Sequence, residues 1–578
     1  MNRESQPHPW LDRAVGMMLA AAVGDALGWP HERRDRTHQL LADSGTNQFV
    51  AWKRMAGSRF RPFTEVIGAG DYSDDTQMII AVGRARLAAG DQWNVWLQRV
   101  EWPLFPFYER GAGASVKRAC KAWAQGRSPW TVSANDARKY FDTGANGAAM
   151  RVAPHVILRH ADASFDDLAV DVVRDAATTH GHPRALLGAL VHAHALWLSM
   201  RQPTPLSYGW LIEALLDNAA QWQAPTFQAL GEEWHSHASR SLEQPIERLW
   251  LATGREVEDL LTLAHKDLKG GAVSAPAVFL KSQGLTGKDR GSGTLCAVAA
   301  AYLATRSAAS PDQALASAAR LEGADTDTLA SMTASLLGAA LGQEWLGANG
   351  RNVQDRPLLV TLAQDLLDPP PQPRLQLPLP EQAQAALTEF GDRLAGAAPG
   401  HTINVPYRRP ARVEAHEDIR SGQWAARHAS LLTEDGQRLY LLHSVHRSTE
   451  NKLKRPGTPE TQLQGAYIAV ADVSRVRQIL QVVFGLRPDR YGHAWVAYGN
   501  LLIAEDDSAT PSPPASSVPR SQLRLTSERV QEIWQLVQEH DLPASADDTR
   551  THLLVHIDPW LTVTLSRPGS RPASGRPA

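Results

Sequence analysis

Cysteine is nearly absent from this sequence of 578 residues, and the two that it contains, Cys120 and Cys296, stand in alanine-rich segments. Two cysteines cannot form a disulfide framework, and alone they cannot make a zinc site. Their surroundings predict that both are small core residues. The scarcity of cysteine fits a protein that folds in a reducing compartment.

An excess of charge is also missing, because the net charge is -2 and the pI is about 6.9. A balanced charge gives no overall attraction to nucleic acid or to an anionic membrane. The apolar run at 14–28 is interrupted by Asp25 and is shorter than a bilayer span. Residues 1–10 form a polar tail without the basic and apolar regions of a secretion signal. We therefore expect a soluble cytoplasmic protein with no membrane segment.

The length predicts two to four domains, because a single core rarely organises so long a chain. Apolar residues recur at helical spacing over residues 11–366, where strand signals are almost absent. This pattern predicts an all-α domain. Residues 33–67 have weak periodicity and are expected to form a long loop or a mobile lid. A proline-rich linker and a helix are expected at 367–400.

Beyond residue 400 the pattern changes to strands and helices. We expect strands at 438–443, 466–470, 493–498 and 501–503, two more within 551–565, and helices at 473–484 and 527–540. These elements predict a smaller α+β domain over residues 401–566, followed by a disordered tail at 567–578. The segment 508–519 is rich in proline and serine and is also expected to be disordered.

A basic run stands within this second domain. We interpret it as a solvated loop, with a nucleic-acid or anionic partner as the alternative. Its residues are Arg447, Lys452, Lys454 and Arg455.

Two aspartates one residue apart, Asp325 and Asp327, are followed by Thr328 and by a helical stretch of small and apolar residues. Carboxylate and hydroxyl oxygens are the hard ligands that Mg²⁺ or Mn²⁺ prefers. The alternative is that Asp327 only caps a buried helix. A second acidic cluster elsewhere in the chain would favour the metal site.

Such a cluster stands in the segment YSDDTQM, where Ser73, Asp74 and Asp75 open a predicted helix. One side chain is enough for each helix cap, and the adjacent carboxylates of Asp74 and Asp75 repel one another. A divalent cation would remove this repulsion. The two clusters together predict a metal site.

The segment 13–28 predicts a buried helix, in which the spacing of Gly16, Ala20 and Gly24 lets another helix approach closely. After this helix come a proline turn and Glu32. Alone, this ending is as typical of an ordinary helix terminus as of a functional site.

A glycine-containing loop includes Asn146, Gly147, Ala148 and Met150. Glycine and asparagine permit backbone geometries that turn N–H groups toward a phosphate, although Asn-Gly is also a common turn. The adjoining Arg151 could neutralise an anion or form a structural ion pair.

Two further segments carry polar groups before predicted helices. Gly291, Ser292 and Gly293 could offer backbone N–H groups to a phosphate, with a flexible connection as the alternative. His180 and His182 alternate in a turn and either face a ligand or form a hydrogen-bonded structural element.

Six motifs resemble those of the ADP-ribosylglycohydrolase family, the group that includes the dinitrogenase reductase-activating glycohydrolase. In chain order they are GMMLAAAVGDALGWPHE, YSDDTQM, GANGAAMRVAP, TTHGHP, GSGTL and GADTDT. The resemblance extends over about residues 11–345, and the fixed order makes it specific.

The resemblance implies a compact all-α fold that holds two Mg²⁺ or Mn²⁺ ions and cleaves the glycosidic bond between ADP-ribose and a modified group. It places Ser73 where many relatives have threonine, and Ala145 and Ala148 in a loop that is richer in glycine elsewhere in the family. The matching positions are Ser73, Asp74, Asp75, Asp325, Asp327 and Thr328 for the metals, Glu32 near the scissile ribose, Asn146 to Met150 for the diphosphate and ribose, and His180 on the adenosine or substrate side.

The sequence therefore predicts a metal-dependent hydrolase that releases ADP-ribose from a protein, a nucleic acid or a small molecule, with the C-terminal domain selecting the target or partner protein. The base that activates water is either Glu32 or a metal-ligating aspartate such as Asp74 or Asp327. The leaving group stays open among arginine, serine, a nucleic-acid base and a small alcohol. The alternative is a catalytically silent ADP-ribose sensor, or an immunity-type protein that blocks a partner transferase.

Overall fold

The computed structural model describes residues 10–32, 38–40, 47–58, 61–202, 206–271, 275–370, 377–406, 409–421, 424–444, 466–470, 473–482, 490–492, 495–498, 501–505, 521–526, 530–539, 542, 544–546, 552–558 and 561–566. The chain divides into two compact units, Met1–Glu450 and Asn451–Ala578. Each unit is described by itself.

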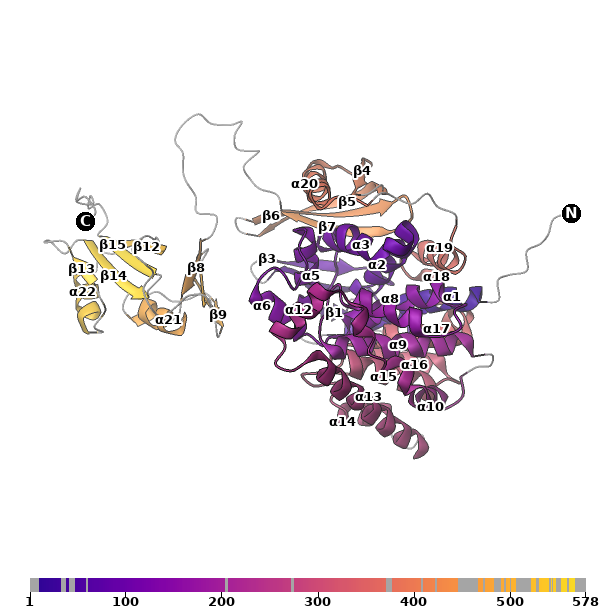
Figure 1. Ribbon diagram of the computed structural model, residues 1–578. Helices are drawn as coiled ribbons and strands as arrows, with labels where there is room; N and C mark the ends of the chain where they lie inside the picture. Colours follow the sequence, from indigo (N-terminus) through magenta and orange to yellow (C-terminus); the bar gives the residue numbers. More distant parts are fainter. Residues whose placement is uncertain are drawn as a thin grey trace. The chain divides into compact units, whose positions relative to one another are not determined.

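The first unit is built mainly from helices (Figure 1). Their bounds are α1 Leu11–Gly28, α2 Asp74–Ala89, α3 Trp93–Trp96, α4 Trp102–Leu104, α5 Ala114–Ala124, α6 Ala134–Phe141, α7 Ala153–Leu158, α8 Asp166–Ala176, α9 Pro183–Arg201, α10 Trp210–Asp217, α11 Ala219–Trp222, α12 Glu232–Ser241, α13 Ile246–Lys269, α14 Pro276–Ser282, α15 Gly293–Arg306, α16 Pro311–Ala319, α17 Thr326–Leu341, α18 Gly347–Asn352, α19 Arg356–Leu367 and α20 Pro380–Gly396.

The helices α1 and α17 pack against each other at the centre of this unit, and both are buried on nearly all sides. Glycines make the approach close. A Cβ on Gly16 would come within 2.4 Å of the carbonyl carbon of Gly342, and a Cβ on Gly24 would lie 2.3 Å from the carbonyl oxygen of Ala330. The predicted close approach of a helix along residues 13–28 is confirmed, and α17 is its partner.

Residues 33–67 do not form the expected long loop where the structure describes them. They contain an antiparallel sheet of β1 His38–Leu40, β2 Trp52–Ser58 and β3 Arg61–Ile67, in the order β1-β2-β3. The face of β2 and β3 turned toward the helices carries Arg54 and Glu65 as an ion pair at 2.7 Å. Because exposed Met55 and Val66 lie on the other face, the sequence lacks the alternation that marks a half-buried strand.

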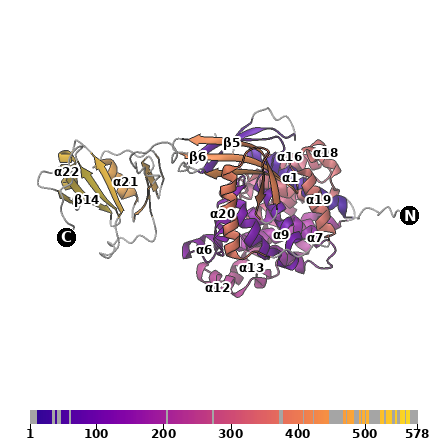
Figure 2. The ribbon, with the colours of Figure 1, turned by 90° about the horizontal axis from the view of Figure 1, so that it is seen from above.

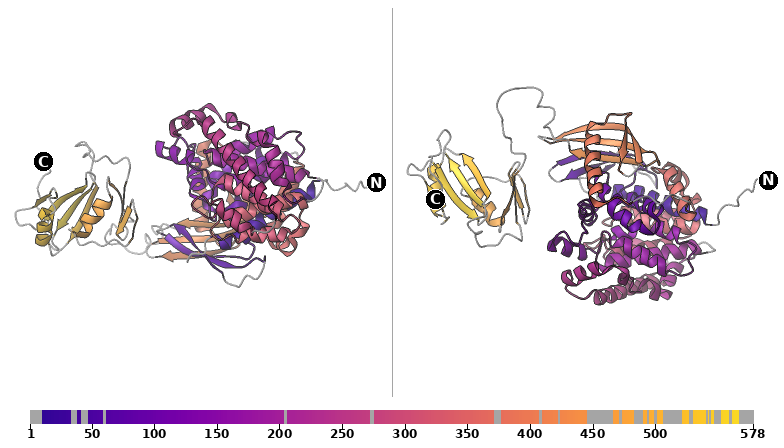
Figure 3. Two further views of the ribbon diagram at one scale, coloured as in Figure 1. Left: turned by 90° about the horizontal axis from the view of Figure 1, so that it is seen from below. Right: turned by 45° about the horizontal axis from the view of Figure 1, so that its top comes forward.

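A second sheet of the first unit follows α20 in the sequence. Its strands are β4 Thr402–Val405, β5 Arg409–Ser421, β6 Trp424–Thr433 and β7 Arg438–Ser444, paired antiparallel in the order β4-β5-β6-β7. The orange strands β5 and β6 lie over the helices together with α20 (Figure 2). In Figure 3 the purple strands of the first sheet run beside the orange strands of the second, in agreement with the contact between β3 and β5.

Ion pairs join this second sheet to the helices. Arg84 of α2 donates to Asp435 at 2.8 Å, and Arg409 of β5 donates to Glu101 at 3.2 Å. Residues 402–444 therefore belong to the same compact unit as the helices, whereas the sequence predicted one domain over residues 401–566. The boundary between the two units follows Glu450.

The second unit contains the same arrangement twice, a strand and a helix followed by three strands. The first copy is β8 Ala466–Val470, α21 Val473–Val482, β9 Arg490–Gly492, β10 Trp495–Tyr498 and β11 Leu501–Glu505, and the second is β12 Ser521–Thr526, α22 Val530–Glu539, β13 Ala544–Ala546, β14 His552–Asp558 and β15 Leu561–Ser566. In each copy the first strand pairs in parallel with the last, and the other pairings are antiparallel.

The expected α+β character beyond residue 400 is confirmed, with both helices and the named strands within a few residues of their predicted bounds. Four expectations lie outside the described residues. They are the tail at residues 1–9, the basic run of Arg447, Lys452, Lys454 and Arg455, the segment 508–519, and the tail at 567–578. None of the helices in the described part of the chain combines the length and apolar character needed to cross a bilayer.

Candidate active site

The first acidic motif forms the turn that opens α2. Ser73 is the N-cap of this helix, and its hydroxyl accepts a hydrogen bond from the backbone N–H of Asp75 at 3.3 Å. Asp74 and Asp75 follow in the first turn, and both are buried. The cap uses the hydroxyl of Ser73, so capping does not account for the two carboxylates.

Asp25 of α1 holds this turn through three hydrogen bonds. Its carboxylate accepts hydrogen bonds from the backbone N–H of Ser73 at 2.9 Å, from the backbone N–H of Thr76 at 3.0 Å and from the Thr76 hydroxyl at 2.7 Å. Asp25 was not among the predicted site residues. The signal was a carboxylate within an otherwise apolar buried helix, because such a group must find partners.

The second acidic motif opens α17. Asp325 is the N-cap residue, but its side chain makes no capping hydrogen bond. Instead its Oδ2 accepts a hydrogen bond from the side-chain amide of Asn146 at 3.0 Å. Asp327 follows in the first turn, where its Oδ1 accepts from the backbone N–H of Thr328 at 2.9 Å. The hydroxyl of Thr326 donates a hydrogen bond to the carbonyl of Gly28 at 2.8 Å. This bond joins the first residue of α17 to the last residue of α1.

The two motifs meet at Asp75. Its Oδ2 accepts a hydrogen bond from the Thr328 hydroxyl at 3.3 Å and lies 3.4 Å from the Ser73 hydroxyl. Its other oxygen, Oδ1, is buried and has no hydrogen-bond partner among the described residues. An unpartnered buried carboxylate oxygen is costly, and a bound cation is one way to compensate it.

A cavity of about 280 Å³ lies in front of these groups. Ten of the residues predicted from the sequence line it, namely Glu32, Asp74, Asp75, Asn146, Gly147, Met150, His180, Asp325, Asp327 and Thr328. The structure thus brings together Glu32, both acidic motifs, the Asn146 loop and His180, which are separated by up to about 300 positions in the chain.

Five predicted residues are not among those that line this cavity. Ser73 and Ala148 are fully buried behind it. Gly291, Ser292 and Gly293 hold the Asn146 loop from its far side, because the carbonyl of Gly291 accepts from the backbone N–H of Asn146 at 2.8 Å and Ser292 forms an isolated bridge with Ala145. Their closest approach to the site is at Gly291, where a Cβ would lie 3.5 Å from Asp325 Oδ2.

One wall of the cavity was missed in the sequence. It consists of residues 111–116, which follow the 3-10 turn at Phe105–Phe107 and include the first residues of helix α5. Gly111 has a φ of +117°, and a Cβ there would lie 3.0 Å from Asp74 Oδ1. The available signal was the small-residue run Gly111-Ala112-Gly113, which resembles the glycine-containing segments that flank the other motifs.

His180 and His182 have different roles. His180 lines the cavity, and its Nδ1 lies 2.8 Å from the Thr179 hydroxyl. Burial, with the nearby charges of Arg151 and Arg118, lowers the pKa of His180 to about 3, so the ring is neutral near pH 7. His182 is the N-cap of α9 and accepts from the backbone N–H of Arg184, which makes it the structural member of the pair.

Arg151 is structural as well. It pairs with Asp175 at 3.1 Å inside the core and donates to the carbonyl of Gly147 at 2.9 Å. It therefore supports the Asn146 loop from behind and leaves no charge for a ligand.

The carboxylates of the site are crowded. Burial raises the pKa values of Asp74, Asp75 and Asp327 well above their ordinary range, and neighbouring carboxylates raise them further. Glu32 is one of these neighbours for both Asp74 and Asp327. A divalent cation among them would stabilise the ionised forms.

The side chains do not stand in a finished ligand arrangement. Within the part of the chain that the structure describes, no group of three or more His, Cys, Asp or Glu residues is arranged to hold a metal ion. The donor chemistry nevertheless fits Mg²⁺ or Mn²⁺, because the site offers carboxylate and hydroxyl oxygens and leaves Asp75 Oδ1 unpartnered.

Known proteins are similar to this chain over part of its length. The model of the ADP-ribosylglycohydrolase family matches residues 6–375. The ADP-ribosyl-[dinitrogen reductase] glycohydrolase of Rhodospirillum rubrum is 28% identical over 198 residues, which cover 31% of this chain and 57% of that protein. The ADP-ribosylarginine hydrolase Tri1 of Pseudomonas putida is 28% identical over 167 residues, 26% of this chain and 38% of that protein. A solved ADP-ribosylglycohydrolase-related protein complex aligns with 62% of this chain and 98% of its own, at 20% identity and a TM-score of 0.35.

Proposed function

Because this chain belongs to the ADP-ribosylglycohydrolase family, we propose that it is a metal-dependent hydrolase that cleaves the glycosidic bond between ADP-ribose and a modified protein, nucleic acid or small molecule. The chain spans about half the length of the curated relatives reported above, so the activity is inferred from the site itself. The observation that carries the proposal is the convergence of Asp75 with Thr328 at one cavity.

Two divalent cations are the cofactors that we propose, Mg²⁺ or Mn²⁺. Bound cations would neutralise the carboxylates, lower the pKa of a water molecule and bind ribose hydroxyls. The residues that would hold them are Ser73, Asp74, Asp75, Asp325, Asp327 and Thr328. The unpartnered Asp75 Oδ1 and the raised pKa values of the aspartates support this assignment.

The remaining groups suit glycosidic cleavage. The transition state develops positive charge on the ribose, and the carboxylates around the cavity would stabilise that charge. Glu32, Asp74 and Asp327 all line the cavity and are the candidates to accept the proton of the attacking water. His180 is neutral near pH 7, so it would orient the substrate through a hydrogen bond and leave the charge of the site unchanged.

The activity is tested by release of ADP-ribose from a panel of substrates: ADP-ribosylated arginine, serine and DNA, and O-acetyl-ADP-ribose. Arginine is placed first because the relative from Pseudomonas putida is named for it. We expect release with Mg²⁺, loss of release with chelator, and at least a thousandfold loss in a variant with Asp325→Ala and Asp327→Ala. Tight binding of ADP-ribose without release from any substrate would replace the hydrolase with a sensor.

The metal site is tested separately by thermal unfolding of wild type and Asp75→Asn. Ligands that bind only the folded state stabilise it by mass action, so Mg²⁺ should raise the Tm of wild type. Without Mg²⁺ we expect Asp75→Asn to be as stable as wild type or more stable, because it removes one carboxylate from a crowded cluster. With Mg²⁺ the order should reverse. An equal response of the two proteins to Mg²⁺ would contradict the assignment of Asp75 as a ligand.

A further inference from the structure

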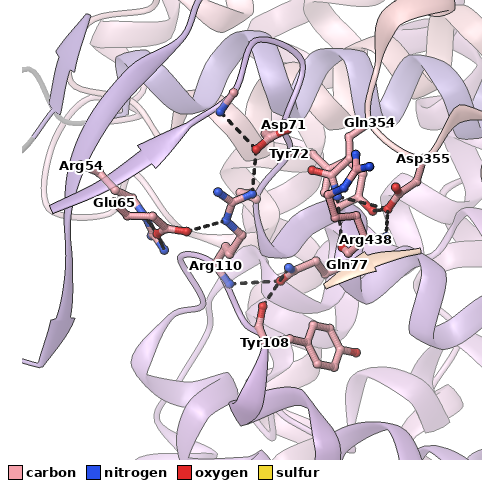
Figure 4. Close-up of polar contacts among 12 residues, drawn as sticks. Arg54, Glu65, Asp71, Tyr72, Gln77, Tyr108, Arg110, Gln354, Asp355 and Arg438 are labelled. Carbon is pink, nitrogen blue, oxygen red and sulfur yellow. Dashed lines mark hydrogen bonds and ion pairs between the residues drawn. The ribbon is translucent and has the colours of Figure 1, made fainter. Parts of the chain in front are cut away.

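Strand β7 lies outside the region that matches the family, which ends at residue 375, and yet it touches the supports of the first acidic turn. Figure 4 shows two groups of polar contacts among these supports, one around Arg110 and one around Asp355. Two routes lead from β7 to the turn at Ser73–Asp75, one on each side of it.

The first route passes through Arg110. The guanidinium carbon of Arg110 lies 3.8 Å from the centre of the Tyr440 ring of β7. Arg110 is buried and pairs with Glu65 at 2.9 Å and with Asp71 at 3.1 Å. These contacts hold the guanidinium on three sides, so the side chain has little freedom to move.

The backbone of Arg110 then holds the acidic turn. Its carbonyl accepts a hydrogen bond from the backbone N–H of Asp74 at 3.2 Å, and its own N–H donates to the Gln77 side chain at 3.1 Å. The next residue, Gly111, already forms part of the cavity wall beside Asp74. A displacement of Arg110 would therefore move both Asp74 and this wall.

The second route passes through Asp355. The backbone N–H of Arg438 of β7 donates to Asp355 Oδ2 at 3.0 Å, and the same oxygen accepts from the Tyr72 hydroxyl at 2.6 Å. Tyr72 is buried and immediately precedes Ser73. Asp355 itself has a left-handed backbone with a φ of 55° at the start of α19, which Asp and Asn tolerate better than other residues.

We propose that β7 positions the Ser73–Asp75 turn, and that Tyr440 and Asp355 are the positioning residues through which it does so. Catalytic groups must be held close to their productive geometry by neighbours that are themselves fixed, and β7 supplies such neighbours on both sides of the turn. The sheet of residues 402–444 is thus a working part of the catalytic unit in this chain. The placement of the turn is independent of the reaction, whereas its effect on turnover rests on the proposed hydrolase activity.

The test is hydrogen exchange of the backbone amides at residues 72–77 in the full chain, compared among three variants. Tyr440→Ala removes the ring from Arg110, and Tyr440→Phe keeps the ring. Leu431→Ala deletes a buried side chain in β6 of the same sheet and controls for a general loss of stability. We expect exchange at the Asp74 amide to rise at least tenfold in Tyr440→Ala and to stay within threefold of wild type in Tyr440→Phe and Leu431→Ala.

Unchanged exchange in Tyr440→Ala would overturn the proposal, and so would an equal rise in Leu431→Ala. Tyr72→Phe removes a single hydroxyl and tests the second route in a variant that keeps the core packing. It should raise exchange at the Ser73 and Asp74 amides at least threefold, and no change there would remove Asp355 from the proposal.

Turnover provides the second readout. We expect kcat of ADP-ribose release to fall at least tenfold in Tyr440→Ala with less than a threefold change in KM, and to recover in Tyr440→Phe. If Leu431→Ala and Tyr440→Ala have the same Tm and lower kcat equally, the sheet contributes only stability. If wild type releases no ADP-ribose from any substrate, the hydrolase proposal fails, while hydrogen exchange still decides whether β7 positions the turn.

Discussion

The side-chain amide of Asn146 donates a hydrogen bond to Asp325 Oδ2 at 3.0 Å, across 179 positions of sequence. The same amide lies 3.4 Å from the sulfur of buried Cys296. Asn146 therefore ties the loop that lines one side of the cavity to the second acidic motif, and it orients a carboxylate that no helix cap holds.

Replacement of Asn146 by alanine should release Asp325 and lower kcat/KM of ADP-ribose release. A hydrogen bond to a charged group contributes about 1.5 to 3 kcal/mol, which corresponds to a loss of roughly tenfold to a hundredfold. Asn146→Asp should be worse than Asn146→Ala, because it places a second carboxylate against Asp325. If Asn146→Asp and wild type have equal kcat/KM at the same Mg²⁺ concentration, the amide donor is dispensable.

The contact of Gly28 with the second motif predicts a stability effect. A Cβ on Gly28 would lie 2.2 Å from the carbonyl oxygen of Thr326. Because this oxygen belongs to the backbone of a buried helix, it cannot move away easily. Gly28→Ala should lower the free energy of unfolding by about 1 to 3 kcal/mol, the usual cost of overpacking. The matched control is Gly396→Ala at the end of α20, where a Cβ meets nothing within 4 Å. Urea denaturation of both variants checks this, and an equal stability of Gly28→Ala and wild type would contradict the close packing of α1 on α17.

The ion pairs of Glu65 predict how stability depends on pH. Burial raises the pKa of Glu65, but the charges of Arg110, Arg54 and His428 outweigh it and lower the pKa to about 2, from an ordinary value of 4.5. Because the pKa is lower in the folded state, this group stabilises the fold above pH 4.5. The stabilisation is lost as the pH falls from 4.5 through about 2. The shift corresponds to about 3 kcal/mol.

Glu65→Gln isolates this contribution. The variant should be less stable than wild type at pH 7, because it removes the charged partner of Arg54 and one of the two carboxylates that pair with Arg110. Its stability should also change less between pH 5 and pH 3. Urea denaturation at several pH values in this window measures both slopes. Parallel curves for the two proteins would show that Glu65 is not the group that titrates.

Much of the candidate site was predictable because its residues belong to short local motifs. Adjacent Asp74 and Asp75 repel one another whatever the fold around them, which is why they predict a cation, and the glycine spacing of residues 13–28 predicts close helix packing by itself. The helical character of the first unit and the positions of α21 and α22 follow from the same kind of local periodicity. So do strands β7, β8, β10, β11, β14 and β15, whereas β4, β5, β6, β9, β12 and β13 were not predicted.

The first sheet was not predictable from periodicity, because its buried face carries an ion pair. Arg54 and Glu65 occupy positions that alternation assigns to apolar residues, while Met55 and Val66 face outward. A buried charge is stable only beside its partner, and the partner is supplied by pairing between strands and by Arg110 from a distant loop.

By itself the sequence determined which residues form the candidate site, their order along the chain and the helices on which they lie. Only the tertiary structure decided which oxygens meet at Asp75, that Asp25 holds the first turn, that residues 111–116 form a cavity wall, and that β7 contacts Asp355. The physical reason is the separation along the chain over which each kind of interaction acts. Helix periodicity and charge repulsion act over a few residues, whereas these contacts join segments that are 48 to more than 250 positions apart and exist only once the chain is packed.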